Sequence, residues 1–195
     1  DLNSLFGPGT LFAYFLIVVP TNSSTTVYSP QAFADVNMLL VDGGSSSLVS
    51  LHSNPTAGKS GQTQYIGPTY ITALNQSGLD FITPEGKVDV RTYTMLLEST
   101  SNCTDLSTFH SETMPLFIAQ GVCGLLNSHV SNITGTSNAI MTSIMLGVDP
   151  FAEVGMTWLR DARALIARWE VNHPGYKVYL GGGAAINTDV VDEVY

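Results

Sequence analysis

Residues 139–183 decide the fold, and their sequence is AIMTSIMLGVDPFAEVGMTWLRDARALIARWEVNHPGYKVYLGGG. The apolar run at 139–148 predicts a buried or half-buried strand. Asp149 is expected to cap a following helix, with Pro150 at its first position, where a missing N–H costs nothing. The segment 176–180 predicts a second strand that ends in three glycines. The order strand, helix, strand therefore follows from local patterns alone.

The segment 150–171 predicts an amphipathic helix. Small and apolar residues recur at helical spacing and define its buried face: Gly155, Trp158, Leu159, Ala162, Leu165, Ile166 and Trp169. Charged residues fall on the opposite face. Both tryptophans are therefore expected in the core rather than in a ligand-binding cage, and residues 172–175 end the helix.

The first forty residues repeat the pattern. The apolar run at 11–19 predicts a strand, because it is about half the length needed to span a bilayer. It also lacks the basic flank and cleavage site of a signal peptide. Ser29 and Pro30 predict the cap and first position of a helix whose apolar residues continue to residue 40.

Two strand–helix units predict an α+β fold. They are the parts of a ferredoxin-like, split βαβ sandwich, in which an antiparallel sheet carries both helices on one face. The middle of the chain has weaker patterns and is rich in Gly, Ser, Thr and Asn. We therefore expect a single domain, residues 1–195, with a long loop-rich insertion at about 42–135.

Composition restricts the function. The chain has 7 basic and 16 acidic residues and a net charge of −9, which argues against binding nucleic acid or anionic headgroups through a basic patch. Only 12% of the residues are charged, against about 25% in typical domains, and 44% are hydrophobic. This composition suits a domain whose surface is partly covered by partners, glycans or other parts of a larger chain.

The two cysteines bear on the compartment. Cys103 and Cys123 would close a loop of about twenty residues, and pairing in an oxidising compartment would stabilise the fold by roughly 3 kcal/mol. In a reducing compartment they would be two buried thiols. Glycosylation sequons favour the first alternative and lie at Asn22, Asn75, Asn102 and Asn132. We therefore expect an extracytoplasmic chain with a disulfide.

Two glycine motifs are better explained by structure than by nucleotide binding. Gly58-Lys59-Ser60 lacks the glycine that a phosphate loop needs five residues earlier, where Ser53 stands, so a surface loop is favoured. The three glycines at 181–183 follow a strand, but the third glycine of a dinucleotide fingerprint would fall on Ile186. A tight turn that needs positive φ or close backbone approach is the favoured interpretation.

Catalytic, cofactor and metal sites are not indicated. The four histidines, His52, His110, His129 and His173, have no metal-binding spacing, and His173 is expected at the surface. No serine or cysteine has the context of an activated nucleophile. Three acidic residues follow the glycine turn, at Asp189, Asp192 and Glu193, and are better explained by the dipole of a helix start. An enzyme is therefore the least expected function, and no cofactor is expected.

Several motifs together resemble a known family. They are, in order, Phe6-Gly7-Pro8-Gly9, Ser29-Pro30, Val49-Ser50, Gly67-Pro68, Trp158-Leu159-Arg160, Tyr179-Leu180-Gly181-Gly182-Gly183-Ala184-Ala185 and Asp189. This series is similar to the soluble porter domain of RND-superfamily transporters, in the MMPL and Patched-like branch. The resemblance covers the whole chain in order and is specific mainly in the last forty residues.

The resemblance implies a ferredoxin-like domain outside the membrane that helps to pass lipid, sterol or other hydrophobic cargo. The energy would come from an ion gradient coupled in membrane helices that this chain does not contain. The implied partners are a sister porter domain, the membrane helices of the same parent chain, a lipid-like molecule, and an oligomer formed through the parent protein. Both ends of the domain would then reach the same membrane surface.

A second hypothesis is a secreted or cell-surface glycoprotein module, such as a receptor or adhesin. The parent gene distinguishes the two hypotheses, because long apolar spans just before Asp1 and just after Tyr195 would favour the transporter.

Overall fold

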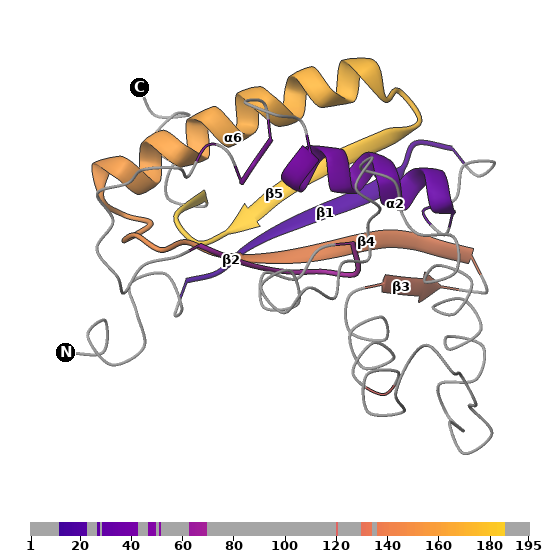
Figure 1. The fold of residues 1–195 in the computed structure, drawn as a ribbon, viewed down its shortest axis with the longest axis horizontal. Coiled ribbons are helices and arrows are strands. Elements are labelled where there is room, and N and C mark those ends of the chain that lie inside the picture. Colours follow the sequence, from indigo (N-terminus) through magenta and orange to yellow (C-terminus); the bar gives the residue numbers. More distant parts are fainter. Residues whose placement is uncertain are drawn as a thin grey trace.

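The computed structural model describes residues 12–22, 27, 29–42, 47–49, 51, 63–69, 120, 130–133 and 136–185. Within these residues an antiparallel sheet carries two α-helices over one face (Figure 1), so a mixed α+β fold is confirmed. The elements are β1 (Tyr14–Pro20), α2 (Pro30–Asn37), the π-helical turn η1 (Met38–Asp42), β2 (Gln64–Ile66), β3 (Val130–Ile133), β4 (Thr136–Met145), α6 (Glu153–Asn172) and β5 (Tyr176–Gly182).

The strand order is β2-β4-β1-β5, with every neighbouring pair antiparallel. The prediction that the runs at 11–19 and 176–180 share a sheet is confirmed, because β1 and β5 pair directly. β4 and β5 run parallel with β1 between them, and α6 connects them. β1 and β2 likewise run parallel with β4 between them.

Two short strands were not predicted from the sequence. β2 pairs with residues 143–145 of β4, and β3 pairs with residues 136–140 of the same strand. Both lie in the range assigned to the insertion, so parts of that range belong to the sheet.

The start of α6 corrects the sequence prediction. The N-cap is Ala152, which makes no side-chain cap, so the predictions that Asp149 caps the helix and that Pro150 is its first residue are both wrong. Asp149 Oδ1 instead accepts the Phe151 N–H at 2.9 Å, which closes a local turn. That turn lies against Gly155, where a Cβ would come within 2.4 Å of the Asp149 carbonyl oxygen. The turn and the first helical residues therefore fit together only with glycine at 155.

The start of α2 is as predicted. Ser29 is the N-cap, its Oγ accepts the Ala32 N–H at 3.1 Å, and Pro30 follows at the first helical position. The helix continues into η1, whose Leu39 and Leu40 carbonyls accept the N–H groups of residues 48 and 49, each at 2.9 Å. These bonds satisfy carbonyls that a helix end leaves without partners.

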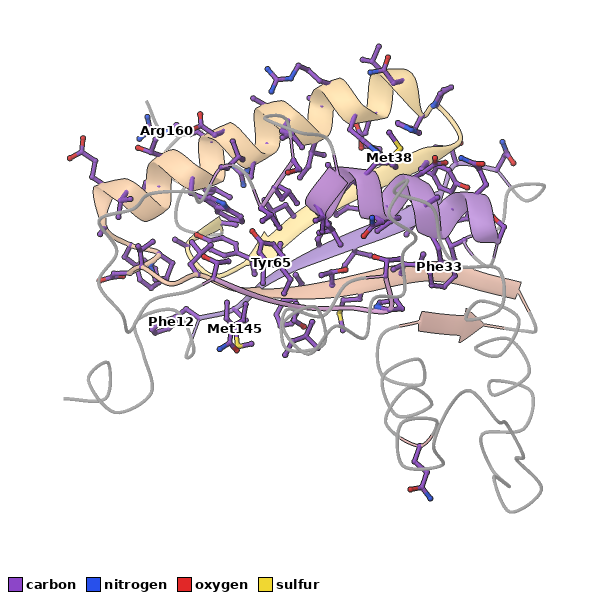
Figure 2. The ribbon with its side chains drawn as sticks, in the orientation of Figure 1. Phe12, Phe33, Met38, Tyr65, Met145 and Arg160 are labelled. Carbon is purple, nitrogen blue, oxygen red and sulfur yellow. The ribbon has the colours of Figure 1, made fainter. Side chains whose placement is uncertain are left out.

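The core lies between the helices and the sheet. Trp158 and Trp169 are 3% and 7% exposed, which confirms both as core residues. The Trp158 ring packs on Tyr14 of β1 with 5.2 Å between centroids. Figure 2 shows Phe33 and Tyr65 between the helices and the sheet, and both are buried.

The glycine turn after β5 has both predicted properties. Gly182 and Gly183 have φ of 77° and 52°, values that favour glycine. A Cβ on Gly183 would lie 2.7 Å from the Tyr14 ring, so the backbone also approaches closely. Tyr14 lies opposite Gly182 in the sheet, and its hydroxyl accepts the Ala184 N–H at 3.3 Å. The described chain therefore enters β1 and leaves β5 at the same end of the sheet.

Candidate functional site: the open face of the sheet

The strands are apolar on both faces. Successive strand residues point to opposite sides, so Tyr14, Leu16 and Val18 of β1 face the helices and are buried. Their neighbours in the strand, Phe15, Ile17 and Val19, point to the other side. A strand with one solvated face usually alternates apolar and polar residues, and β1 does not.

The strand register joins these side chains to others of the same kind. Ile17 lies between Met141 of β4 and Tyr179 of β5. Figure 2 shows Met145 on the side of the sheet away from the helices. We call this surface the open face, and its large apolar residues are Phe15, Ile17, Val19, Ile66, Met141, Met145 and Tyr179.

The open face is accessible. Phe15 is 39% and Tyr179 55% exposed, and the other members are partly exposed. Both described α-helices lie on the opposite side of the sheet (Figure 1). The polar side chains that the structure describes on this face belong to Ser143, Gln64 and Lys177. The surface can therefore bury apolar area against a ligand or partner.

Among the described strands β5 is at the edge of the sheet, and Glu170 of α6 covers this edge. Glu170 Oε1 accepts the Val178 N–H and its Oε2 accepts a hydrogen bond from Lys177 Nζ, each at 2.7 Å. Burial would raise the pKa of Glu170, but these two hydrogen bonds and the charge of Lys177 outweigh it and hold the pKa below its ordinary value. Because a carboxylate occupies this edge N–H, strand addition at Val178 is blocked.

A polar cluster joins the two helices at the far end of α6. Asp35 Oδ1 accepts a hydrogen bond from Gln31 Nε2 at 2.7 Å and lies 3.8 Å from His173 Nε2. The His173 ring stacks on Trp169 with 4.2 Å between centroids. Burial, followed by the charge of Asp35, raises the pKa of Tyr176. His173 is half-buried rather than a surface residue, because the ring packs on α6 and faces α2.

Of the predicted modification sites, Asn22 is exposed, as a glycosylated residue must be. Asn132 lies in β3, and its side chain is not described. Asn75, Asn102, Cys103 and Cys123 lie outside the described residues, as do the motif at 58–60 and the acidic residues after 186. The disulfide and the glycans remain predictions.

Neither a candidate metal site nor a candidate membrane span occurs among the described residues. They contain no group of three or more His, Cys, Asp or Glu side chains that could hold a metal ion. No helix that they form is long and apolar enough to cross a membrane. The described residues form an apolar surface on the open face beside the sheet edge that Glu170 closes.

Sequence reasoning did not identify the open face as a site. The signal was present, because most odd-numbered and most even-numbered residues in the runs at 11–19 and 139–148 are apolar. Such runs indicate strands buried on both faces, and the sequence does not say which face the helices cover.

Comparison with known proteins identifies no relative: no family model, no curated protein and no solved structure matches this chain.

Proposed function

We propose that this chain is the extracytoplasmic porter domain of an RND-superfamily transporter of the MMPL or Patched-like branch. It helps to pass lipid, sterol or another hydrophobic cargo, with energy from an ion gradient coupled in membrane helices of the parent protein. The observation that carries the proposal is the open face, where Phe15, Ile17 and Met141 offer apolar side chains from neighbouring strands.

The proposal includes a ferredoxin-like arrangement of the domain. The order β2-β4-β1-β5 supports it, because each pair of parallel strands in that order has an antiparallel strand between its members. The helices α2 and α6 then follow equivalent strands of two βα units. The described parts of the range 42–135 include the short strands β2 and β3, and the loop-rich insertion in the rest of this range is part of the proposal.

The path of the chain also supports the proposal. Because Tyr14 lies opposite Gly182, the described chain enters and leaves at one end of the sheet. Such a path suits a domain between two membrane helices that emerge on the same side of a bilayer.

In this mechanism the cargo lies flat against the open face. Binding removes the partly exposed side chains of Ile17, Met141 and Met145 from water, at about 25 cal/mol for each Å² of apolar area. Methionine adapts its shape to irregular ligands. Tyr179 at the outer strand presents an apolar ring with a polar tip, which suits an amphipathic cargo. The sister domain would cover the other side of the cargo.

The test measures binding of fluorescent sterol, phospholipid and fatty-acid probes to the purified domain. We expect Met141→Gln to weaken binding of the accepted probe about tenfold, because covering a methionine side chain is worth about 1.5 kcal/mol or more. Met38→Gln is the matched control, since Met38 is 44% exposed but lies in η1 of the helical layer. No binding of any probe, or an equal loss in both variants, would contradict the proposal.

The extracytoplasmic location has its own test. Protein from a secretory host should contain the Cys103–Cys123 disulfide and a glycan at Asn22. Mass spectrometry under non-reducing conditions that finds two free thiols would rule out the disulfide and weaken the assignment to this compartment.

The second candidate is a secreted or cell-surface binding module. Tyr179, 55% exposed on an apolar face, favours it, because tyrosine is enriched in the centres of protein interfaces. A parent gene without long apolar spans around this domain, together with protein binding at the open face, would establish this function instead.

A further inference from the structure

Exposed apolar side chains gather at one end of the molecule. Phe12 is 45%, Phe151 43% and Val154 43% exposed. The rings of Phe12 and Phe151 meet edge to face, with 5.0 Å between centroids. These three residues, which we call the aromatic end, come from the segment just before β1, the turn before α6 and the first turn of α6.

The aromatic end is also where the described chain enters and leaves the domain. Tyr14 lies opposite Gly182, and the Tyr14 hydroxyl accepts the Ala184 N–H. Phe12 lies two residues before Tyr14. The ring pair of Phe12 and Phe151 therefore lies near the place where the chain enters β1 and leaves β5.

The exposed charges closest to Phe151 in the sequence are acidic, whereas the positive charge of Arg163 on α6 acts on Tyr14 at this end of the sheet. Asp149 and Glu153 are exposed on either side of Phe151 in the sequence. Arg160, about 10 Å further along the helix, points away from the sheet in Figure 2. The two acidic side chains disfavour an anionic surface and permit one without net charge.

We propose that the aromatic end rests in the headgroup region of a bilayer that carries no net negative charge. This inference rests on the proposed function, because membrane helices before β1 and after β5 would hold this end next to the lipid. Aromatic rings are favoured at the boundary between headgroups and acyl chains, where they bury apolar area without leaving the interface.

The first experiment adds one tryptophan to the two native ones, at either of two surfaces, and mixes each variant with vesicles of brominated phosphatidylcholine. We expect Phe151→Trp fluorescence to shift to the blue and to be quenched, and both effects to weaken when phosphatidylglycerol is added. Tyr179→Trp on the open face should behave like the unsubstituted protein. The native Trp158 and Trp169 are buried and contribute the same background to every variant.

The second experiment compares vesicle flotation of two serine variants. Phe151→Ser should lose most of the vesicle-bound fraction, and Val171→Ser should retain it. Val171 is 80% exposed but lies about 25 Å along α6 from Val154, at the opposite end of the helix. This control distinguishes contact at the aromatic end from non-specific hydrophobic binding to vesicles.

Absence of quenching in Phe151→Trp, or an equal loss of flotation in both serine variants, would overturn the inference. Quenching of Tyr179→Trp alone would show that the open face contacts the bilayer in place of the aromatic end, and would also overturn the inference. Failure of cargo binding at the open face, with vesicle binding intact, would overturn the proposed function and leave this inference standing.

Discussion

The two faces of the sheet are built from the same strands and the same kinds of residue, yet they differ in burial. On the covered face, Leu16, Ile140 and Ile144 are at most 1% exposed beneath the helices. On the open face, alternate residues of the same strands remain accessible, and Phe15 is 39% exposed. The difference is made by the helices α2 and α6, and the strand sequences themselves are apolar on both sides.

This comparison separates stability from function. The covered face supplies the packing that a domain of this size needs, and its rings and aliphatic side chains fill one continuous core. The open face contributes less burial on folding, so its apolar residues are available for an intermolecular contact. Substitutions on the covered face should therefore lower the stability of the fold. Substitutions on the open face should weaken binding and change stability little.

The largest expected effect is on the covered face. Trp158→Ala should lower the free energy of unfolding by about 3–5 kcal/mol, because it leaves a cavity beside Tyr14 and removes their ring contact. Denaturant unfolding measures the change. An unchanged denaturant concentration at the unfolding midpoint would mean that this face of α6 is not packed in the core.

A smaller loss is expected at the glycine turn. Gly183→Ala should lower the free energy of unfolding by about 1–3 kcal/mol. A Cβ at this position would be strained by the φ of 52° and would clash with the Tyr14 ring. Gly181→Ala is the matched control, because a Cβ there has nothing within 4 Å. Equal melting temperatures for the two variants would contradict the geometry of this turn.

The next effect depends on pH. Glu170 has a folded pKa below its ordinary value of 4.5, so its contribution is fully present above that pH and is lost as pH falls through the folded pKa. Glu170→Gln should cost about 1 kcal/mol at neutral pH and reduce the loss of stability on acidification. Asp161→Asn, an exposed change on the same helix, should retain the acid dependence of the native protein. Parallel acid profiles for native protein and Glu170→Gln would show that this carboxylate does not close the sheet edge.

The smallest effect is expected on the open face. Tyr179→Ser should change the free energy of unfolding by no more than about 0.5 kcal/mol, because the side chain is 55% exposed. Thermal unfolding checks this value. A loss as large as that of Trp158→Ala would mean that the open face is covered and belongs to the core.

Much of the fold could be predicted because its signals are local. Ser29 with Pro30 marks a helix start, and the spacing of Trp158 and Trp169 marks a buried helix face. The cap of α6 could not be predicted, because Asp149 is equally suited to close the turn that it forms with Phe151. Short strands such as β2 depend on pairing with a distant part of the chain, which a local pattern does not contain.

The candidate site was harder to predict for a related reason. Ile17 and Met141 have the composition of buried strand residues, and only the placement of both helices on one face leaves them accessible. Glu170 accepts a hydrogen bond from Val178, eight positions further along the chain. No helical or strand spacing predicts such a pair.

The central claim is that the open face binds hydrophobic cargo, and a ¹H–¹⁵N NMR titration of the domain with the accepted lipid probe tests it most directly. We expect the amide signals of Phe15, Met141 and Tyr179 to shift together with a single dissociation constant, while those of the exposed side of α6, such as Arg160, stay in place. Shifts confined to the helical layer, or no saturable shift in any part of the chain, would contradict the claim.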